Sequence, residues 1–239
     1  MLRRIRVVIP AATDRWDRLF GEELAKYADP DTNIEIRHLT RGAESIEDAF
    51  DEVWSALPTV REVVSAEEDG CAGAIIYCYS DPGLHAAKIA VSIPVVGLGE
   101  ASAHLASLLG PRFGVLTVGP PESNGWQVDI DKLRVYGLDE KCVGFETIDT
   151  AIEGLRERDE SFTPRVDRAC EKLLDRGATV FVLGCGALLS VDDRISEKFN
   201  VPVVVPAAAA IKLCEALVAL GLTQSKRAYP PPGEKVRVD

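Results

Sequence analysis

Short apolar runs alternate with amphipathic segments along the 239 residues of the chain. Runs rich in Val, Ile and Leu have the length of buried strands, and they cover residues 5–10, 34–39, 73–78, 93–98, 113–118, 143–148, 180–185 and 201–205. Segments with helical periodicity lie between them, at residues 16–28, 45–66, 82–90, 101–109, 163–176, 188–199 and 207–220. Continuous apolar strands separated by helices indicate parallel sheets with both faces covered, so the predicted fold class is α/β.

Several predicted helices carry boundary signals. Ser45 precedes Asp48 by three positions, a capping-box pattern with Asp in place of Glu, and this predicts a helix that starts at Ser45. In the pair Asp81-Pro82, proline occupies a first helical position. Glycines follow three predicted helices as stop signals, at positions 110, 177 and 221.

The chain repeats its own pattern. The apolar runs "GAIIYC" and "VFVLGC" end on Cys78 and Cys185, and Pro94 and Pro202 open the next strands at the same separation to within one residue. An Ala-rich helix that ends at a glycine follows each of these strands. The repeat predicts two pseudo-symmetric lobes, each a mostly four-stranded parallel sheet flanked by helices.

The chain order predicts that the lobes exchange their last helix. Residues 1–97 together with 207–239 form lobe one, which carries Cys78. Residues 98–206 form lobe two, which carries Cys185. Because ligands bind at strand C-termini and at lobe junctions, we expect the active site in a cleft between the lobes.

Composition excludes several classes of partner. The net charge of −11 and the absence of a basic stripe argue against nucleic acid. No apolar run reaches the roughly 18 residues of a membrane span, and the first apolar run is too short for a signal-peptide core. We therefore expect a cytoplasmic protein with a small-molecule substrate. The six cysteines lack zinc spacing and "GLGEA" lacks the spacing of a dinucleotide loop, so no disulfide, metal or cofactor is predicted.

Two cysteines at strand ends can act as an acid/base pair. Backbone N–H groups and a helix N-terminus beside such a thiol favour its thiolate. If Cys78 and Cys185 lie on opposite faces of one carbon, one removes a proton and the other returns a proton to the opposite face. The stereocentre inverts, and the reverse reaction exchanges the two roles.

Six stretches of the chain resemble the hydantoin and allantoin racemases of the aspartate/glutamate racemase superfamily. They are residues 45–52, 78–88, 93–117, 182–188, 201–222 and 225–232, and they include "CYSDPGLHAAK" and "VLGCGAL". The resemblance implies a cofactor-independent two-base racemase, in which Cys78 and Cys185 match the two catalytic cysteines. Because members of this superfamily are often oligomeric, the resemblance also implies a homo-oligomer.

The chain departs from the superfamily pattern at polar positions. Ile9 and Ala11 stand where asparagines are usual, and Val118 stands where a second threonine follows Thr117. Pro206 takes part in a Val-Pro pair in place of Asp-Gly. Because hydrogen-bonding groups are missing while both cysteines remain, we expect a different and less polar substrate.

Residues near the predicted strand ends are candidates for substrate binding: Pro10, Ala12, Thr13, Ile46, Tyr79, Thr117 and Gly186. Tyr79 directly follows Cys78 and is expected to line the cleft. Ser80 and Asp81 are interpreted as turn and cap residues. His85 is interpreted as a helix-surface residue and His104 as a packing residue.

The leading hypothesis is a racemase or epimerase of a carbonyl-activated stereocentre, in particular of a 5-substituted hydantoin or related ureide. One alternative is an isomerase or decarboxylase of a small dicarboxylate on the same scaffold. A decarboxylase of this kind needs only one of the two cysteines. A second alternative is a non-catalytic protein that closes its lobes on a small anion.

Overall fold

The computed structural model describes residues 2–119, 126–150, 155 and 159–237. It contains two four-stranded sheets with the strand orders β2-β1-β3-β4 and β6-β5-β7-β8. All pairings between these strands are parallel. The strands are β1 Arg3–Ile9, β2 Thr32–His38, β3 Gly73–Ile76, β4 Val95–Gly97, β5 Phe113–Gly119, β6 Cys142–Asp149, β7 Val180–Leu183 and β8 Val203–Val204. The predicted α/β fold with two similar parallel sheets is confirmed.

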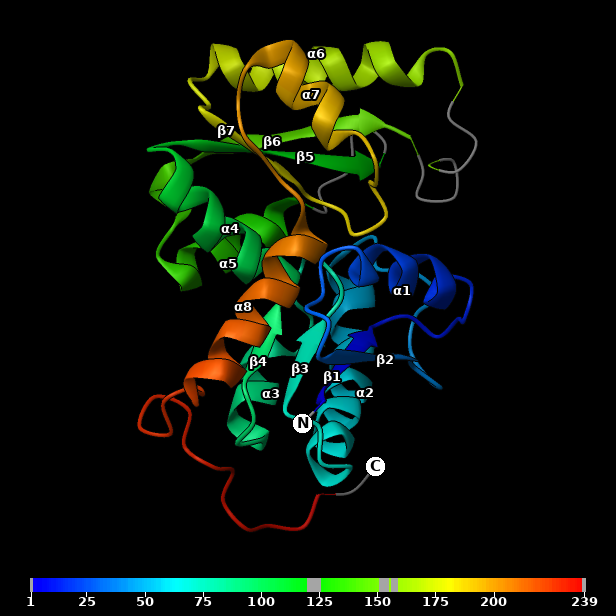
Figure 1. Ribbon diagram of the computed structural model, residues 1–239, viewed down its shortest axis with the longest axis vertical. Coiled ribbons are helices and arrows are strands. Elements are labelled where there is room, and N and C mark those ends of the chain that lie inside the picture. Colours follow the sequence, from blue (N-terminus) through cyan, green and yellow to red (C-terminus); the bar gives the residue numbers. More distant parts are fainter. Residues whose placement is uncertain (1, 120–125, 151–154, 156–158, 238–239) are drawn as a thin grey trace.

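Helices cover both sheets (Figure 1). They are α1 Asp17–Ala25, α2 Ala49–Glu68, α3 Leu84–Ala90, α4 Leu98–Leu109, α5 Trp126–Tyr136, α6 Phe162–Asp175, α7 Asp192–Phe199 and α8 Pro206–Leu220, with a 3₁₀ turn at Asp139–Lys141. After β8 the chain returns to the first sheet, where α8 packs against β3 and β4. The helix α4 contacts β4 as well as β5, β7 and β8. The residue limits of the two lobes therefore stay a prediction. None of the helices in the described part of the chain has the length and apolar character that crossing a bilayer requires.

The main hydrophobic core runs through both halves of the molecule. One continuous cluster of buried side chains includes Ile75 of β3, Leu98 of α4, Ala209 of α8 and Val115 of β5. A second cluster, around Val63 of α2, covers the other face of the first sheet. Because apolar side chains stay in contact across the junction, burial itself holds the two sheets together.

Several predicted helix boundaries differ from the structure. Pro82 does not occupy a first helical position, because it lies in a turn and α3 begins at Leu84 after Gly83. The helix α2 begins at Ala49, because Asp48 has an extended backbone and its carboxylate accepts the N–H groups of Phe50 (2.8 Å) and Asp51 (3.0 Å). The hydroxyl of Ser45 instead donates to Glu47. The helix α4 ends at Leu109, as the stop signal at Gly110 predicted, but this glycine has an extended backbone instead of the left-handed one of a C′ residue. The helix α7 begins only at Asp192, because residues 188–191 are not helical and Ser190 has a left-handed backbone with φ of 56°.

We expect Asp48→Ala to lower the free energy of unfolding by about 1 kcal/mol, because two N–H groups at the start of α2 lose their acceptor. Ser45→Ala is the matched control and should stay within about 0.5 kcal/mol of the unmodified protein. Urea unfolding followed by circular dichroism measures both. A larger loss for Ser45→Ala than for Asp48→Ala would contradict this assignment of the helix start.

Candidate active site

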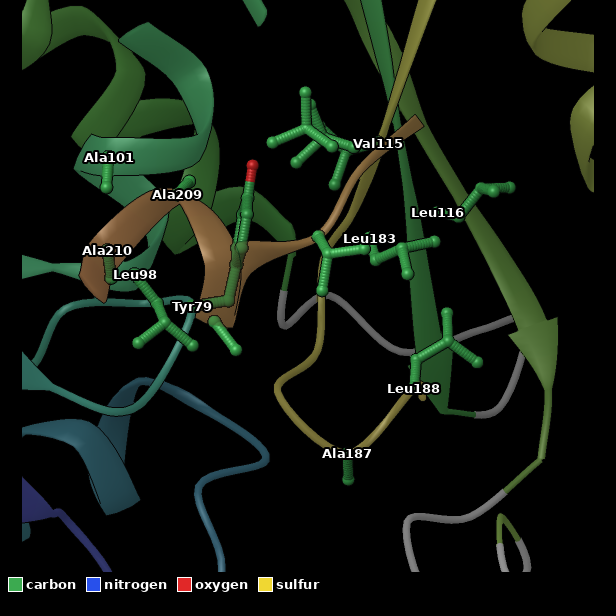
Figure 2. Close-up of a cluster of buried hydrophobic side chains, with 14 of the residues drawn as sticks. Tyr79, Leu98, Ala101, Val115, Leu116, Leu183, Ala187, Leu188, Ala209 and Ala210 are labelled. Carbon is green, nitrogen blue, oxygen red and sulfur yellow. The ribbon is translucent and has the colours of Figure 1, made fainter. Parts of the chain in front are cut away.

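Cys78 and Cys185 occupy matching positions in the two halves. Cys78 lies two residues after the end of β3, and Cys185 lies two residues after the end of β7. Both are half-buried free thiols. The thiol of Cys78 lies 3.4 Å from the hydroxyl of Ser80 and also receives the Ser80 backbone N–H. The thiol of Cys185 receives the backbone N–H groups of Ala187 and Leu188, in the turn that Figure 2 shows below β7.

The two cysteine turns touch each other. The hydroxyl of Tyr77 donates to the carbonyl oxygen of Gly186 at 3.4 Å. A Cβ atom on Gly186 would lie only 2.7 Å from a ring carbon of Tyr77. The residue before one cysteine is therefore in contact with the residue after the other. Tyr77 was not predicted as a site residue, because an aromatic residue within an apolar run is also typical of core packing.

Burial governs the ionisation of both thiols. It raises the pKa of Cys78 to about 12, against the opposing hydrogen bonds from Ser80, while the charges of Asp129 and Cys185 add to the rise. Burial also raises the pKa of Cys185, and the N–H groups of Ala187 and Leu188 oppose the rise. Both cysteines are thus thiols at neutral pH. The predicted helix N-terminus beside Cys185 is absent, because α7 starts later, and turn N–H groups take its place.

The buried carboxyl of Asp81 anchors the turn that carries Cys78. Asp81 is 1% exposed and has a left-handed backbone with φ of 50°. Its oxygens accept the N–H groups of Gly99 (3.0 Å) and Glu100 (2.7 Å) and the hydroxyl of Tyr136 (2.7 Å). Gly99 has to be a glycine, since a Cβ there would lie 2.1 Å from the carbonyl oxygen of Tyr79. Asp81 therefore caps α4, and not the helix that follows it in the chain.

The helix α5 adds a second clamp on the same turn. The ammonium of Lys132 donates to the carbonyl oxygen of Ser80 and to the carboxylate of Glu52, both at 2.5 Å. It thereby links α5 to the start of α2 and to the residues after Cys78. No helix was predicted over residues 126–136, so sequence reasoning missed Lys132 and Tyr136. The one signal it offered was the spacing of Leu133 and Tyr136 on one helix face.

The other predicted site residues lie near strand ends or in the loops that follow them, and with one exception their expected position in the cleft stays a prediction. Pro10, Ala12 and Thr13 follow β1, and the N–H of Ala12 donates to Ala43 at 2.7 Å, in the loop that also carries Ile46. Thr117 lies on β5, with its Cβ 3.4 Å from the position that a Cβ of Gly184 would take.

The exception is Tyr79. It is 6% exposed, and its ring meets that of Phe145 edge-on at 6.5 Å. Figure 2 shows it standing among the apolar side chains of α4 and α8. Its ring belongs to the core and not to the predicted cleft, because apolar neighbours surround it on the inner side of the turn.

Neither candidate histidine lies against a cysteine. His85 is exposed on α3, and its ring centroid lies 5.0 Å from that of Tyr229 with the two rings tilted by 58°. It lines a pocket of about 610 Å³ together with Lys88, Glu100 and His104. This pocket also touches Asp81 and Lys132, and neither Cys78 nor Cys185 is among its lining residues. The interpretation of His85 as a helix-surface residue is confirmed.

Comparison with known proteins decides the family. A family model described as Asp/Glu/Hydantoin racemase matches residues 5–214. The chain belongs to this family. A hydantoin racemase of Rhizobium meliloti is 32% identical to this chain over 207 residues, which are 83% of each protein. That of Pseudomonas sp. (strain NS671) is 29% identical over 234 residues, which are 97% of this chain and 93% of the relative.

Solved structures lead to the same family. The allantoin racemase from Klebsiella pneumoniae superimposes with a TM-score of 0.89 at 29% identity, over 99% of this chain and 96% of the other. The predicted family and the predicted enzyme class, an isomerase of the racemase type, are confirmed.

Asp81 makes stability depend on pH. Burial raises its pKa from 3.8 to about 7, against the hydrogen bonds from Tyr136, Glu100 and Gly99. The folded state then holds a proton that the unfolded chain has already lost, so stability from this group falls as pH rises from about 4 to 7. When the pH rises from 5 to 8, we expect the free energy of unfolding of the unmodified protein to fall by about 2 kcal/mol relative to that of Asp81→Asn. Urea unfolding of both proteins at the two pH values tests this, and a constant difference would contradict it.

Gly186→Ala should lower the free energy of unfolding by about 1–3 kcal/mol, because the new methyl group collides with the ring of Tyr77. That ring is 3% exposed and is stacked on Phe20 at 4.4 Å, which prevents it from moving away. Gly233→Ala is the control, since a Cβ there has no neighbour within 4 Å. Equal free energies of unfolding of the two variants would contradict this prediction, because they would mean that the ring of Tyr77 moves away from the new methyl group at no cost.

Proposed function

We propose that this enzyme inverts the stereocentre of a 5-substituted hydantoin or a related ureide, with Cys78 and Cys185 as its two acid/base groups. One observation carries the proposal. Two half-buried thiols occupy equivalent turns of a duplicated fold, and the residues beside them, Tyr77 and Gly186, touch across the junction. In a racemase, the group that acts as the base in one direction acts as the acid in the other. The two groups therefore have to occupy equivalent positions on opposite faces of one carbon.

The proton inventory of this reaction balances without a cofactor. One cysteine, as thiolate, takes the proton from the ring carbon that carries the substituent. The electron pair left on that carbon moves onto the adjacent carbonyl oxygen and forms an enolate. The other cysteine, as thiol, then protonates the carbon on its opposite face and becomes the thiolate. The product is the mirror image, and the enzyme is ready for the reverse reaction with the roles of Cys78 and Cys185 exchanged.

The turns are suited to carry the single negative charge. Both thiols are protonated in the ligand-free protein, so the pair has to lose one proton before the reaction starts. The N–H of Ser80 beside Cys78, and those of Ala187 and Leu188 beside Cys185, lower the cost of that ionisation. Each turn thus stabilises the charge when its own cysteine is the base.

The relatives support the substrate class. Two are named hydantoin racemases and one an allantoin racemase, and each similarity covers most of both chains. At positions where the superfamily is usually polar, this chain carries Ala11 and Pro206, both buried, and Val118. Apolar side chains at these positions favour a hydantoin with an apolar 5-substituent over one with a polar ureido group.

We expect Cys78→Ser and Cys185→Ser each to reduce racemisation at least about 10³-fold, because a serine hydroxyl is a far weaker acid than a thiol. Each variant should still exchange the α-proton of one enantiomer for deuterium, at the face served by the remaining cysteine. Polarimetry measures inversion and NMR in deuterated water measures exchange. Cys142→Ser, which alters another half-buried thiol, is the control with full turnover expected.

The substrate assignment is tested by the same NMR experiment on a panel. Hydantoins with alkyl and aryl substituents, allantoin, free amino acids and substituted malonates are compared. Fast loss of the α-proton signal from apolar hydantoins is expected. Full turnover in both serine variants would end the two-thiol mechanism, and decarboxylation of a malonate without exchange on any hydantoin would end the substrate assignment.

A further inference from the structure

Asp129 lies on the face of α5 that is fastened to the Cys78 turn. Residues three or four positions apart on a helix share a face. Lys132, one turn after Asp129, binds the carbonyl oxygen of Ser80, and Tyr136, one turn further, binds the carboxylate of Asp81 at 2.7 Å. The side of α5 that Asp129 shares with these two residues is therefore the side that meets the cysteine turn.

One oxygen of the Asp129 carboxyl lacks a partner. Its Oδ1 atom is buried, and among the residues that the structure describes it has no hydrogen-bond partner. The cation that acts on it, Lys132, is already held by Glu52 and Ser80. A buried acceptor without a donor costs roughly 1–3 kcal/mol. Such groups are rare in folded proteins and gather at sites that bind ligands.

The charge of Asp129 reaches both reagents. It contributes to the raised pKa of Cys78 and to that of Cys185, which agrees with the position beside the Cys78 turn that the contacts of Lys132 and Tyr136 give this face of α5. A carboxylate at this place opposes formation of either thiolate. The role of Asp129 is therefore not to activate the cysteines. A hydrogen-bond donor on the ligand would give its unpaired oxygen a partner.

We propose that Asp129 is a specificity-determining residue, whose carboxyl accepts a hydrogen bond from a ring N–H of the cyclic ureide. The inference rests on the function proposed above and adds to it the group that recognises the substrate's nitrogen. Burial raises the pKa of Asp129 well above its usual range in the absence of ligand. An N–H···O bond from the substrate to the orphaned oxygen stabilises the ionised carboxylate, and the bond is then charge-assisted. A dicarboxylate substrate brings a second negative charge to the same place and is repelled.

Tyr79 is the competing internal partner. Its hydroxyl is also buried without a hydrogen-bond partner in the described part of the chain, and the charge of Asp129 raises its pKa further beyond the effect of burial. If Asp129 is only a hydrogen-bond partner of Tyr79, then Tyr79→Phe and Asp129→Ala lower the free energy of unfolding alike and change kcat/KM for all substrates equally. If Asp129 serves the ligand, its removal changes substrates selectively.

The test combines a protein change with a substrate change. A 5-alkylhydantoin is compared with its two N-methyl derivatives, each of which lacks one ring N–H. In the unmodified enzyme, we expect methylation of the nitrogen that Asp129 contacts to lower kcat/KM about 100-fold. In Asp129→Ala the same methylation should change kcat/KM less than about 3-fold, because the acceptor is gone. Asp129→Asn keeps an acceptor oxygen and should restore part of the discrimination.

Asp131→Ala is the matched control on the same helix. Its carboxylate is 61% exposed and pairs with Arg134 at 2.5 Å. N-methylation of the substrate should therefore lower kcat/KM of this variant as much as that of the unmodified enzyme. An unchanged penalty in Asp129→Ala would overturn the inference. An equal loss on all substrates together with a lower Tm would also overturn it, since this is the result of a structural role.

Two readouts separate this inference from the function on which it rests. If the unmodified enzyme racemises no hydantoin or ureide, the proposed function fails. If it racemises them and the penalty does not depend on Asp129, only the present inference fails. The placement is checked without turnover by alkylation with iodoacetamide at pH 9. Asp129→Asn should speed the labelling of Cys78 and Cys185 several-fold, and unchanged rates would overturn the placement.

Discussion

The buried carboxylate of Asp81 is the interaction on which the candidate site depends. It joins three segments that are distant in the sequence: the turn after β3, the first turn of α4 and the end of α5. Glycines at positions 97 and 99 make room for it, since a Cβ at either would collide with the turn. The position of Cys78 relative to the second sheet follows from this junction, and so does the placement of Lys132 and Asp129 beside it.

The two cysteine turns are alike in geometry and different in support. Side chains from the other half of the chain, Lys132 and Tyr136, hold the turn of Cys78 from outside. The turn of Cys185 relies on its own backbone N–H groups and on the contact of Gly186 with Tyr77. A racemase needs its two reagents to be equivalent in position and reach. It does not need them to be held by the same means, and duplication followed by divergence of the surroundings meets this requirement.

Sequence reasoning located the eight strands found among the described residues, because parallel strands buried on both faces leave continuous apolar runs. It placed both cysteines at strand ends for the same reason. It missed α5, because "WQVDIDKLRVY" mixes charged and apolar residues, and tertiary contacts of Lys132 and Tyr136 hold this helix in place. Asp129 was missed with it. Tyr79 was placed in the cleft because position in the chain reveals where a backbone runs, whereas the direction of a side chain within a turn depends on neighbours far away in sequence.

The return of α8 to the first sheet has a consequence for the order of events during synthesis. The strands β1 to β4 leave the ribosome before the second sheet, but α8, which contacts β3 and β4, leaves only after β8. Until then, Gly73 lacks the Cys214 side chain that packs on it, and an apolar face of the sheet stays open to water. The second sheet meets no such delay, because its strands and the helices α6 and α7 are contiguous in the chain. The first sheet is therefore made before the second and completed after it.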